Sequence, residues 1–253
     1  MQLKIARTED GEPEIFRSIQ GEGVAAGRAR TFIRLSGCNL HCVWCDTAYT
    51  WNWRDTPFTH ERDTRAAPHK FDPAREMIKL APEEAAALIL EAPNEGLVIT
   101  GGEPLMQMQG VIALIDALKP SAPHMLFEIE TNGTIAPKPA LAERVDLFMV
   151  SPKLAHSGNA AGLALKADAL QAFAALDTAA FKFVARSEAD IDTIALLAND
   201  LELGNERVWV MPEGTESAPL NERGRRLVGA IAAHGFNYAD RLHIHLFGQK
   251  RGV

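Results

Sequence analysis

The sequence lacks the marks of several protein classes. It contains no run of about 18 apolar residues, the minimum for a membrane-spanning helix, and its first residues, MQLKIARTEDGEPEIF, lack the apolar core of a signal peptide. Lys and Arg number 26 against 33 Asp and Glu, a formal net charge of -7, so the basic surface of a nucleic-acid-binding protein is missing. We therefore expect a cytoplasmic protein that acts on a small molecule and binds neither nucleic acid nor membrane.

Cysteine is scarce and confined to one place. The chain has three cysteines, Cys38, Cys42 and Cys45, all within GCNLHCVWCDT. An odd number of thiols so close together cannot form a disulfide framework, and free thiols fit a reducing compartment. The spacing C-x3-C-x2-C instead suggests three ligands for one metal centre.

Short apolar runs alternate with amphipathic stretches along the chain. Runs such as LVIT and LFMV are typical of strands covered on both faces. The predicted strands are 3–7, 31–36, 97–100, 125–130, 147–150, 180–184, 207–211 and 242–246. The predicted helices are 82–91, 104–118, 137–144, 167–176, 187–199 and 219–234. This alternation predicts an α/β fold with a parallel sheet and right-handed crossovers.

One segment interrupts the alternation. Residues 49–79 hold several aromatic side chains and many charges without a clear period. We expect a single domain over residues 1–253 that carries an insertion at about 49–79. The insertion either packs over the sheet by its aromatic side chains or forms a lid beside the site.

Polar, Gly-rich or Pro-rich groups follow five predicted strands. They are GC (37–38), GGEP (101–104), TNGT (131–134), SPK (151–153) and PEGT (212–215). The carboxyl ends of parallel strands share one edge of the sheet, where ligands bind. These five loops are therefore expected to line the mouth of a single ligand-binding cavity.

The chemistry of three thiolates favours iron and sulfur over zinc. Structural zinc sites take four protein ligands and catalytic ones three plus water, and His41, between Cys38 and Cys42, is poorly placed to serve as a ligand. Iron–sulfur clusters prefer thiolates. Three cysteines around a four-iron cluster would leave one iron open for a small molecule, and Trp44 could shield the cluster or contact that molecule.

In its cysteine loop and in GGEP the sequence resembles the radical S-adenosylmethionine superfamily. GCNLHCVWC resembles its C-x3-C-x-aromatic-C signature, and GGEP resembles its glycine-rich loop. The resemblance implies a partial (β/α) barrel of parallel strands. It also implies a [4Fe-4S] cluster on Cys38, Cys42 and Cys45, whose open iron binds S-adenosylmethionine and whose electron releases a 5′-deoxyadenosyl radical.

Three further motifs narrow the resemblance. IQGEG (19–23), Arg34 in FIRLSGC, and CDT (45–47) are similar to the 7-carboxy-7-deazaguanine synthase family from about residue 16 to the end. The chain departs from that family at 49–79 and in HIHLFGQKRGV. The resemblance implies ring contraction of 6-carboxy-5,6,7,8-tetrahydropterin to 7-carboxy-7-deazaguanine with loss of ammonia, in queuosine and deazapurine biosynthesis. It further implies Mg2+, an electron donor such as flavodoxin, and a homodimer.

The resemblance also assigns residues to the site. Thr47 is placed at Mg2+, which prefers oxygen ligands. The residues placed at the cofactor are Trp44, Asp46, Gly101, Gly102, Glu103, Glu130, Ser151, Pro152 and Lys153. The residues placed at the substrate are Ile19, Gln20, Gly21, Glu22, Arg34, Thr100, His245 and Val253.

Several of these side chains have a physical reason to act there. The guanidinium of Arg34 offers a planar fork for a carboxylate, and Gln20 and Glu22 could pair with an amide and amine edge. Glu130 and Lys182 are charges within apolar strands, so each needs a partner. They either line the mouth or form a structural pair.

The C-terminal region carries two closely spaced histidines. His243 and His245 alternate with apolar residues and would share one face of the expected strand 242–246. Of the two, we expect His245 to lie near the substrate. The Val253 carboxylate is placed at the site by resemblance alone.

Two other functions remain open. A radical activase that takes hydrogen from a protein glycine would carry a similar cysteine loop but should lack IQGEG and CDT. A zinc-stabilised binding module without catalysis would hold zinc and no iron.

Overall fold

A computed structural model describes residues 1–64 and 66–253; residue 65, inside the predicted insertion, lies outside the described residues. The described residues form a 10-stranded sheet in the order β10-β9-β8-β7-β6-β5-β3-β1-β4, with β2 paired to β3. The strands are β1 (Leu3–Ala6), β2 (Ile15–Ile19), β3 (Ala29–Leu35), β4 (Met77–Leu80), β5 (Gly96–Gly101), β6 (Leu126–Thr131), β7 (Leu147–Val150), β8 (Ala179–Ala185), β9 (Val208–Pro212) and β10 (Asn237–Tyr238).

Helices connect the strands. The α-helices are α1 (Pro73–Glu76), α2 (Pro82–Leu90), α3 (Met108–Leu118), α4 (Pro139–Ala142), α5 (Ala161–Ala164), α6 (Ala167–Ala174), α7 (Glu188–Asp200), α8 (Ser217–Ala233) and α9 (Leu242–Phe247). The 3-10 turns are η1 (Gly23–Ala25), η2 (Ala48–Thr50), η3 (Pro104–Gln107), η4 (Ala155–Ser157) and η5 (Asn205–Arg207).

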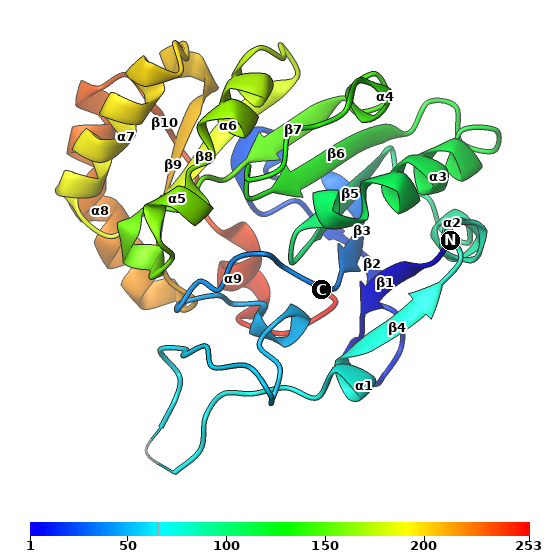
Figure 1. Ribbon diagram of the computed structural model, residues 1–253. Coiled ribbons are helices and arrows are strands. Elements are labelled where there is room, and N and C mark those ends of the chain that lie inside the picture. Colours follow the sequence, from blue (N-terminus) through cyan, green and yellow to red (C-terminus); the bar gives the residue numbers. More distant parts are fainter. Residues whose placement is uncertain (65) are drawn as a thin grey trace.

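The sheet is mostly parallel and does not close. Every neighbouring pair from β3 through β5, β6, β7, β8 and β9 to β10 is parallel. β1 pairs antiparallel with β3 and β4, and β2 pairs antiparallel with β3. The expected partial barrel of parallel strands is thus confirmed. Figure 1 shows α2, α3 and α6–α8 along the outer side of the curved sheet, with α9 and the C-terminal end on the other side.

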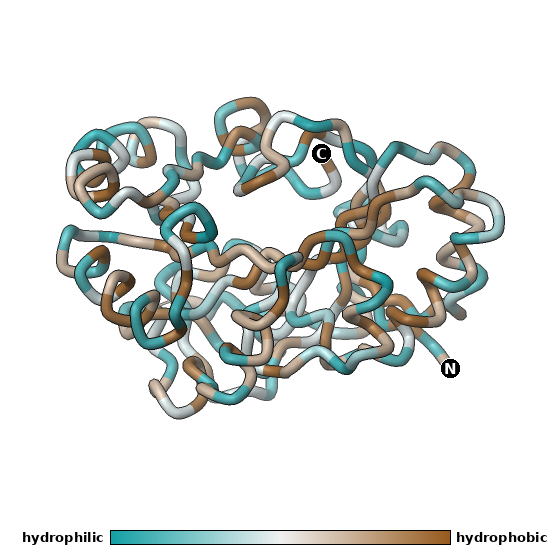
Figure 2. The backbone as a smooth tube through the Cα atoms, turned by 90° about the horizontal axis from the view of Figure 1, so that it is seen from above, coloured by the Kyte–Doolittle hydropathy of each residue, from teal (hydrophilic) through white to brown (hydrophobic). Residues whose placement is uncertain are grey.

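The main core lies between the sheet and its outer helices. Phe148 on β7 packs edge-on against Phe173 on α6, with ring centroids 5.4 Å apart, and both side chains are fully buried. Seen from above, hydrophobic segments run along the strands while hydrophilic ones occupy loops and outer helix surfaces (Figure 2). Burial of this apolar surface, at about 25 cal/mol per Å2, holds the strand ends in place.

Local sequence explains where two of the helices begin. In α2, Pro82 occupies the first turn and the Glu84 carboxylate accepts from the backbone N–H of Ala81 at 2.7 Å. In α7, the Asp190 carboxylate accepts from the backbone N–H of Ser187 at 2.9 Å. Such bonds satisfy N–H groups near a helix start that have no intrahelical partner.

Seven of the eight predicted strands correspond to observed ones, but the prediction of a strand at 242–246 is wrong. Residues Leu242–Phe247 form α9. β10 already occupies the sheet edge beside β9, so the LHIHL alternation finds no strand partner there. The alternation of apolar residues and histidines wrongly predicted a strand with one buried face. In the structure Ile244 is buried but Leu246 is 61% exposed, so the apolar residues do not share one buried face.

Part of the predicted insertion belongs to the sheet. Met77–Leu80 forms β4, which pairs with β1. The preceding part packs on the cysteine loop: Phe58 stacks on His41, and a ring nitrogen of His60 lies 2.8 Å from the carbonyl oxygen of Cys45. The aromatic side chains of this segment therefore cover the cysteine loop. Among the described residues, we find no helix with the length and apolar character needed to cross a membrane.

Candidate active site

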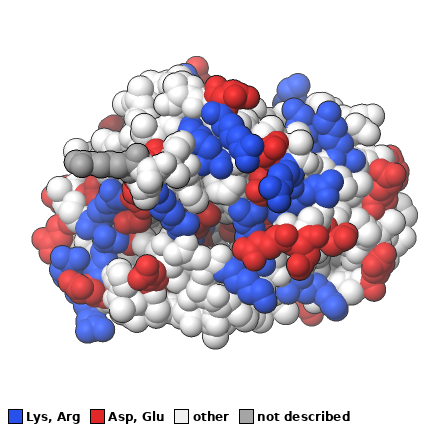
Figure 3. Space-filling view, turned by 90° about the horizontal axis from the view of Figure 1, so that it is seen from below, with Lys and Arg blue, Asp and Glu red and all other residues white. Residues whose placement is uncertain are grey.

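One cavity collects most of the residues that the sequence singled out. It opens at the carboxyl ends of the parallel strands, as expected for this fold. The predicted residues that line it are Ile19, Gln20, Gly21, Glu22, Arg34, Cys38, Cys42, Trp44, Cys45, Asp46, Thr47, Thr100, Gly101, Gly102, Glu130, Ser151, Lys153 and Val253. The molecule is hollowed on the face drawn in Figure 3, where acidic and basic side chains are interspersed.

The two glycines after β5 are required by close packing. A Cβ atom on Gly101 would lie 2.0 Å from the carbonyl oxygen of Leu35, and one on Gly102 would lie 2.1 Å from that of Gly37. The backbone N–H of Gly102 donates to the carbonyl oxygen of Leu35 at 3.0 Å, and the backbone N–H of Glu103 donates to the carbonyl oxygen of Gly37 at 2.8 Å. The glycine-rich loop is therefore joined directly to the start of the cysteine loop.

Each of the three thiols receives a hydrogen bond at its sulfur. The backbone N–H of Leu40 lies 3.4 Å from the Sγ of Cys38, and the side-chain amide of Asn159 lies 3.3 Å from that of Cys42. The indole N–H of Trp51 donates to the Sγ of Cys45 at 3.3 Å. These donors would stabilise negative charge on the sulfur atoms.

Without a metal the thiols hold their protons. Burial is the largest cause for all three: it raises the pKa of Cys42 to about 12 and raises the pKa of Cys38 and Cys45 above their ordinary values. Metal ligands must be deprotonated, so metal binding at this loop would release protons. All three are free thiols.

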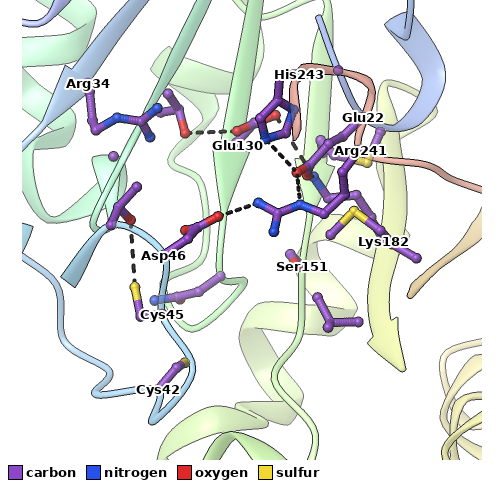
Figure 4. Close-up of a pocket in the computed structure, with 18 of the residues that line it drawn as sticks. Glu22, Arg34, Cys42, Cys45, Asp46, Glu130, Ser151, Lys182, Arg241 and His243 are labelled. Atoms are coloured by element: carbon purple, nitrogen blue, oxygen red, sulfur yellow. Dashed lines mark hydrogen bonds and ion pairs between the residues drawn. The ribbon is translucent and has the colours of Figure 1, made fainter. Parts of the chain in front are cut away.

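A network of buried charges forms another part of the cavity wall (Figure 4). Arg241 donates its Nε to Glu22 at 2.9 Å and also pairs with Asp46. Lys182 pairs with Glu22 as well. Burial alone would raise the pKa of Glu22, but the cations of Lys182 and Arg241 outweigh it and hold this pKa well below its usual range. Glu22 is therefore a carboxylate at neutral pH.

Glu130 joins the charged network to the polar strand ends. Its carboxylate accepts from the Thr100 hydroxyl at 2.8 Å and from the Gln20 amide at 3.2 Å, and it lies 3.9 Å from the Nζ of Lys182. Of the two interpretations left open for Glu130 and Lys182, each is partly correct. The two charges lie near each other and also line the cavity.

Arg34 is held in place by a buried carboxylate. Its Nε donates to Glu14 at 2.8 Å, and the Tyr49 hydroxyl donates to the same carboxylate at 2.9 Å. Glu14 is fully buried. These contacts orient the guanidinium of Arg34 into the cavity wall.

Three predicted residues do not line the cavity. The Glu103 carboxylate is buried and accepts from the Thr131 hydroxyl at 2.8 Å and the Asn132 backbone N–H at 2.7 Å, so it ties two strand ends together. Pro152 is absent from the lining, and His245 contacts Ser217 and Asp240 instead. The helical turn of α9 places His243 in the lining, 3.8 Å from Glu22.

The packing of α9 also explains a glycine of IQGEG. A Cβ on Gly21 would lie 2.1 Å from the imidazole of His243, and the backbone N–H of Leu242 donates to the Gly21 carbonyl at 3.0 Å. No motif in the sequence pointed to Arg241, because its partners Glu22 and Asp46 lie 219 and 195 positions away. Only the folded chain brings these three side chains together.

Comparison with known proteins places this geometry in a family. The 7-carboxy-7-deazaguanine synthase of Pyrobaculum aerophilum is 33% identical over 241 residues, which cover 94% of this chain and 95% of that protein. The chain belongs to the 7-carboxy-7-deazaguanine synthase family. The enzyme of the same name from Halobacterium salinarum is 34% identical over 258 residues, covering 92% of this chain and 89% of that protein.

Two further comparisons agree with membership of this family. Residues 19–173 match the family described as a 4Fe-4S single cluster domain. The crystal structure of QueE from Escherichia coli aligns with a TM-score of 0.65 at 24% identity, covering 96% of this chain and 95% of that one. At that identity the structural match shows a shared fold.

The cysteine loop fits the iron–sulfur cluster that this family description names. All three sulfur atoms line one cavity and each accepts a hydrogen bond, one of the features that tune iron–sulfur clusters. Among residues 1–64 and 66–253, no three His, Cys, Asp or Glu side chains converge as ligands of a single metal ion.

The cavity also has room beyond the thiols for further ligands. From the cysteine loop its wall continues past Gly101 and Gly102 to Ser151 and Lys153, whose side chains bond at 2.7 Å. The Thr47 hydroxyl lines the same cavity, 3.6 Å from the Sγ of Cys45. A molecule bound at the sulfur end would therefore lie beside the charged network.

Proposed function

We propose that this chain converts 6-carboxy-5,6,7,8-tetrahydropterin to 7-carboxy-7-deazaguanine with release of ammonia, a step of queuosine and deazapurine biosynthesis. The observation that carries the proposal is that one cavity joins three free thiols at C-x3-C-x2-C to Gln20, Glu22 and Arg34. Membership of the 7-carboxy-7-deazaguanine synthase family supports it.

Cys38, Cys42 and Cys45 would hold a [4Fe-4S] cluster, and S-adenosylmethionine would bind at the one iron of the cluster that has no protein ligand. When bound, this pair supplies a 5′-deoxyadenosyl radical that takes a hydrogen atom from the substrate. The hard chemistry belongs to the cofactor, whereas the protein provides orientation and exclusion of water.

The residues of the cavity wall suit the pterin. Gln20 carries an amide and Glu22 a carboxylate, which can pair with the donor and acceptor edge of the ring. Arg34, already oriented by Glu14, can bind the substrate carboxylate through its remaining N–H groups. The Thr47 hydroxyl can serve Mg2+, which commonly keeps several waters and needs few protein ligands.

The charged network would hold these groups still. Glu22 is fixed by Lys182 and Arg241, and the same Arg241 holds Asp46 next to the last cysteine. The substrate-binding loop and the cysteine loop are thus joined by one guanidinium. Rigid support of this kind keeps reacting groups within the narrow geometry that catalysis needs.

Several features of the setting belong to the same proposal. We expect the enzyme to act in the cytoplasm, where thiols remain reduced, to take its electron from a donor such as flavodoxin, and to form a homodimer. The glycine-activase alternative is disfavoured because the chain carries both IQGEG and CDT.

The test is anaerobic incubation of the iron-loaded chain with reductant, S-adenosylmethionine and the carboxytetrahydropterin. We expect the mass of 7-carboxy-7-deazaguanine, with one ammonia for each product. An iron-loaded protein that cleaves S-adenosylmethionine but leaves the pterin unchanged would contradict the proposal and favour the activase. A colourless protein that holds zinc would favour the binding module.

A further inference from the structure

The last residues of the sequence return to the cavity. After α9 ends, residues 248–253 run back across the molecule, and Val253 lines the cavity. Figure 1 places this end of the chain between α9 and the strands β1 and β4. Along the way Gln249 contacts the Arg62 side chain and donates to the Thr215 hydroxyl at 3.1 Å.

Arg251 fastens this tail to the segment before β4. Its guanidinium carbon lies 3.5 Å from the centroid of the Tyr49 ring and 5.7 Å from that of Phe71. Its Nη1 also pairs with the Glu76 carboxylate at 2.6 Å. A planar cation stacked on an aromatic face and paired with a carboxylate has little freedom to move.

The anchor leads directly to a residue of the proposed site. The Tyr49 ring beneath Arg251 bonds through its hydroxyl to Glu14, and Glu14 accepts from Arg34. Tyr49 and Glu14 are both buried. The guanidinium of Arg251 thus packs on the same group of side chains that orients Arg34.

From these contacts we propose that Arg251 is a positioning residue, which fixes the tail as one wall of the cavity and thereby sets the affinity for substrate. The inference rests on the proposed function. Arg251 acts through Val253 and through the Tyr49–Glu14–Arg34 contacts. Loss of the anchor should therefore weaken substrate binding and leave the chemical step nearly unchanged.

Two variants and one control test this. Arg251→Ala removes both contacts, whereas Arg251→Lys keeps a charge for Glu76 and loses the planar group on Tyr49. Lys250→Ala is the control, because Lys250 is exposed and neighbours Arg251 in the sequence. Each protein is loaded with iron, and KM and kcat for the carboxytetrahydropterin are measured beside hydrogen exchange of residues 248–253.

For Arg251→Ala we expect faster exchange in the tail, a KM about tenfold higher and a kcat within about twofold of the parent. Arg251→Lys should lie between, and Lys250→Ala should match the parent. Unchanged exchange in Arg251→Ala would overturn the anchor, and faster exchange with an unchanged KM would overturn its role in binding. If the parent itself does not convert the pterin, the proposed function fails, while the exchange result still decides the anchor.

Discussion

The indole N–H of Trp51 points at the Sγ of Cys45, with 3.3 Å between nitrogen and sulfur. Trp51 is buried and lies six positions after that cysteine. From the segment that follows the cysteine loop, it therefore acts on one of the three proposed cluster ligands. This contact links the segment whose aromatic side chains cover the cysteine loop to the redox chemistry expected of a cluster held by the three thiols.

Replacement of Trp51 by Phe should lower the reduction potential of the cluster. The missing N–H leaves more negative charge on the thiolate, which disfavours the reduced cluster. A hydrogen bond worth about 1 kcal/mol corresponds to a shift of about 40 mV for one electron. The potential is read by a redox titration followed by electron paramagnetic resonance. Trp53→Phe serves as control, and equal potentials for all three proteins would show that Trp51 does not tune the cluster.

Arg34→Lys should raise the KM for the carboxypterin by roughly 10- to 100-fold, because a Lys ammonium cannot replace a planar fork on a carboxylate. Steady-state kinetics at saturating S-adenosylmethionine measure the effect. Arg17→Lys, on the exposed side of β2, should leave KM unchanged. An Arg34→Lys enzyme with the parent KM would remove Arg34 from substrate binding.

Thr47→Ala should weaken Mg2+ binding roughly tenfold, about the value of one hydroxyl interaction. The measurement is the Mg2+ concentration that gives half-maximal turnover. Thr47→Ser keeps the hydroxyl and should resemble the parent, while the affinity for S-adenosylmethionine should change little in either variant. An unchanged magnesium response in Thr47→Ala would exclude this hydroxyl as a ligand.

Glu22→Gln should destabilise the cluster-free protein at pH 7 by about 3–5 kcal/mol, because it leaves the buried cations of Lys182 and Arg241 short of one carboxylate. Folding lowers the pKa of Glu22 below its ordinary value of 4.5. The ionised group therefore contributes its full stability above about pH 4.5, and this contribution is lost as the pH falls further.

Urea unfolding of the parent and of Glu22→Gln between pH 3 and pH 7 measures that dependence. The difference in free energy of unfolding between the two should be constant from about pH 5 upward and should shrink below pH 4.5. Glu12→Gln, at an exposed position, should show no such pH-dependent difference. A difference that grows as the pH falls would contradict the assignment of Glu22 as a carboxylate.

Much of this site could be predicted from the sequence because its parts are local in the chain. The three cysteines lie within one loop, and Gly101 and Gly102 directly follow an apolar strand. A parallel sheet then brings such loops together without further information. For this reason the sequence alone predicts that the cysteine loop and the glycine loop meet at one edge of the sheet.

The remaining features depend on contacts between distant segments. Arg241 could not be predicted, since only the folded chain shows that it lies between Glu22 and Asp46. The alternation in LHIHL indicated a strand, yet β10 occupies the sheet edge and α9 forms instead. Because this segment is helical rather than extended, His243 lines the cavity and the predicted His245 does not.

We propose that Cys38, Cys42 and Cys45 hold a cluster with one iron left open for S-adenosylmethionine. Electron paramagnetic resonance of the reduced, air-free protein with and without S-adenosylmethionine decides whether such an open iron is present. We predict the signal of a reduced [4Fe-4S] cluster whose g values shift when S-adenosylmethionine is added. A cluster signal that S-adenosylmethionine leaves unchanged, or a protein that binds no iron, would show that the three cysteines do not hold such a cluster.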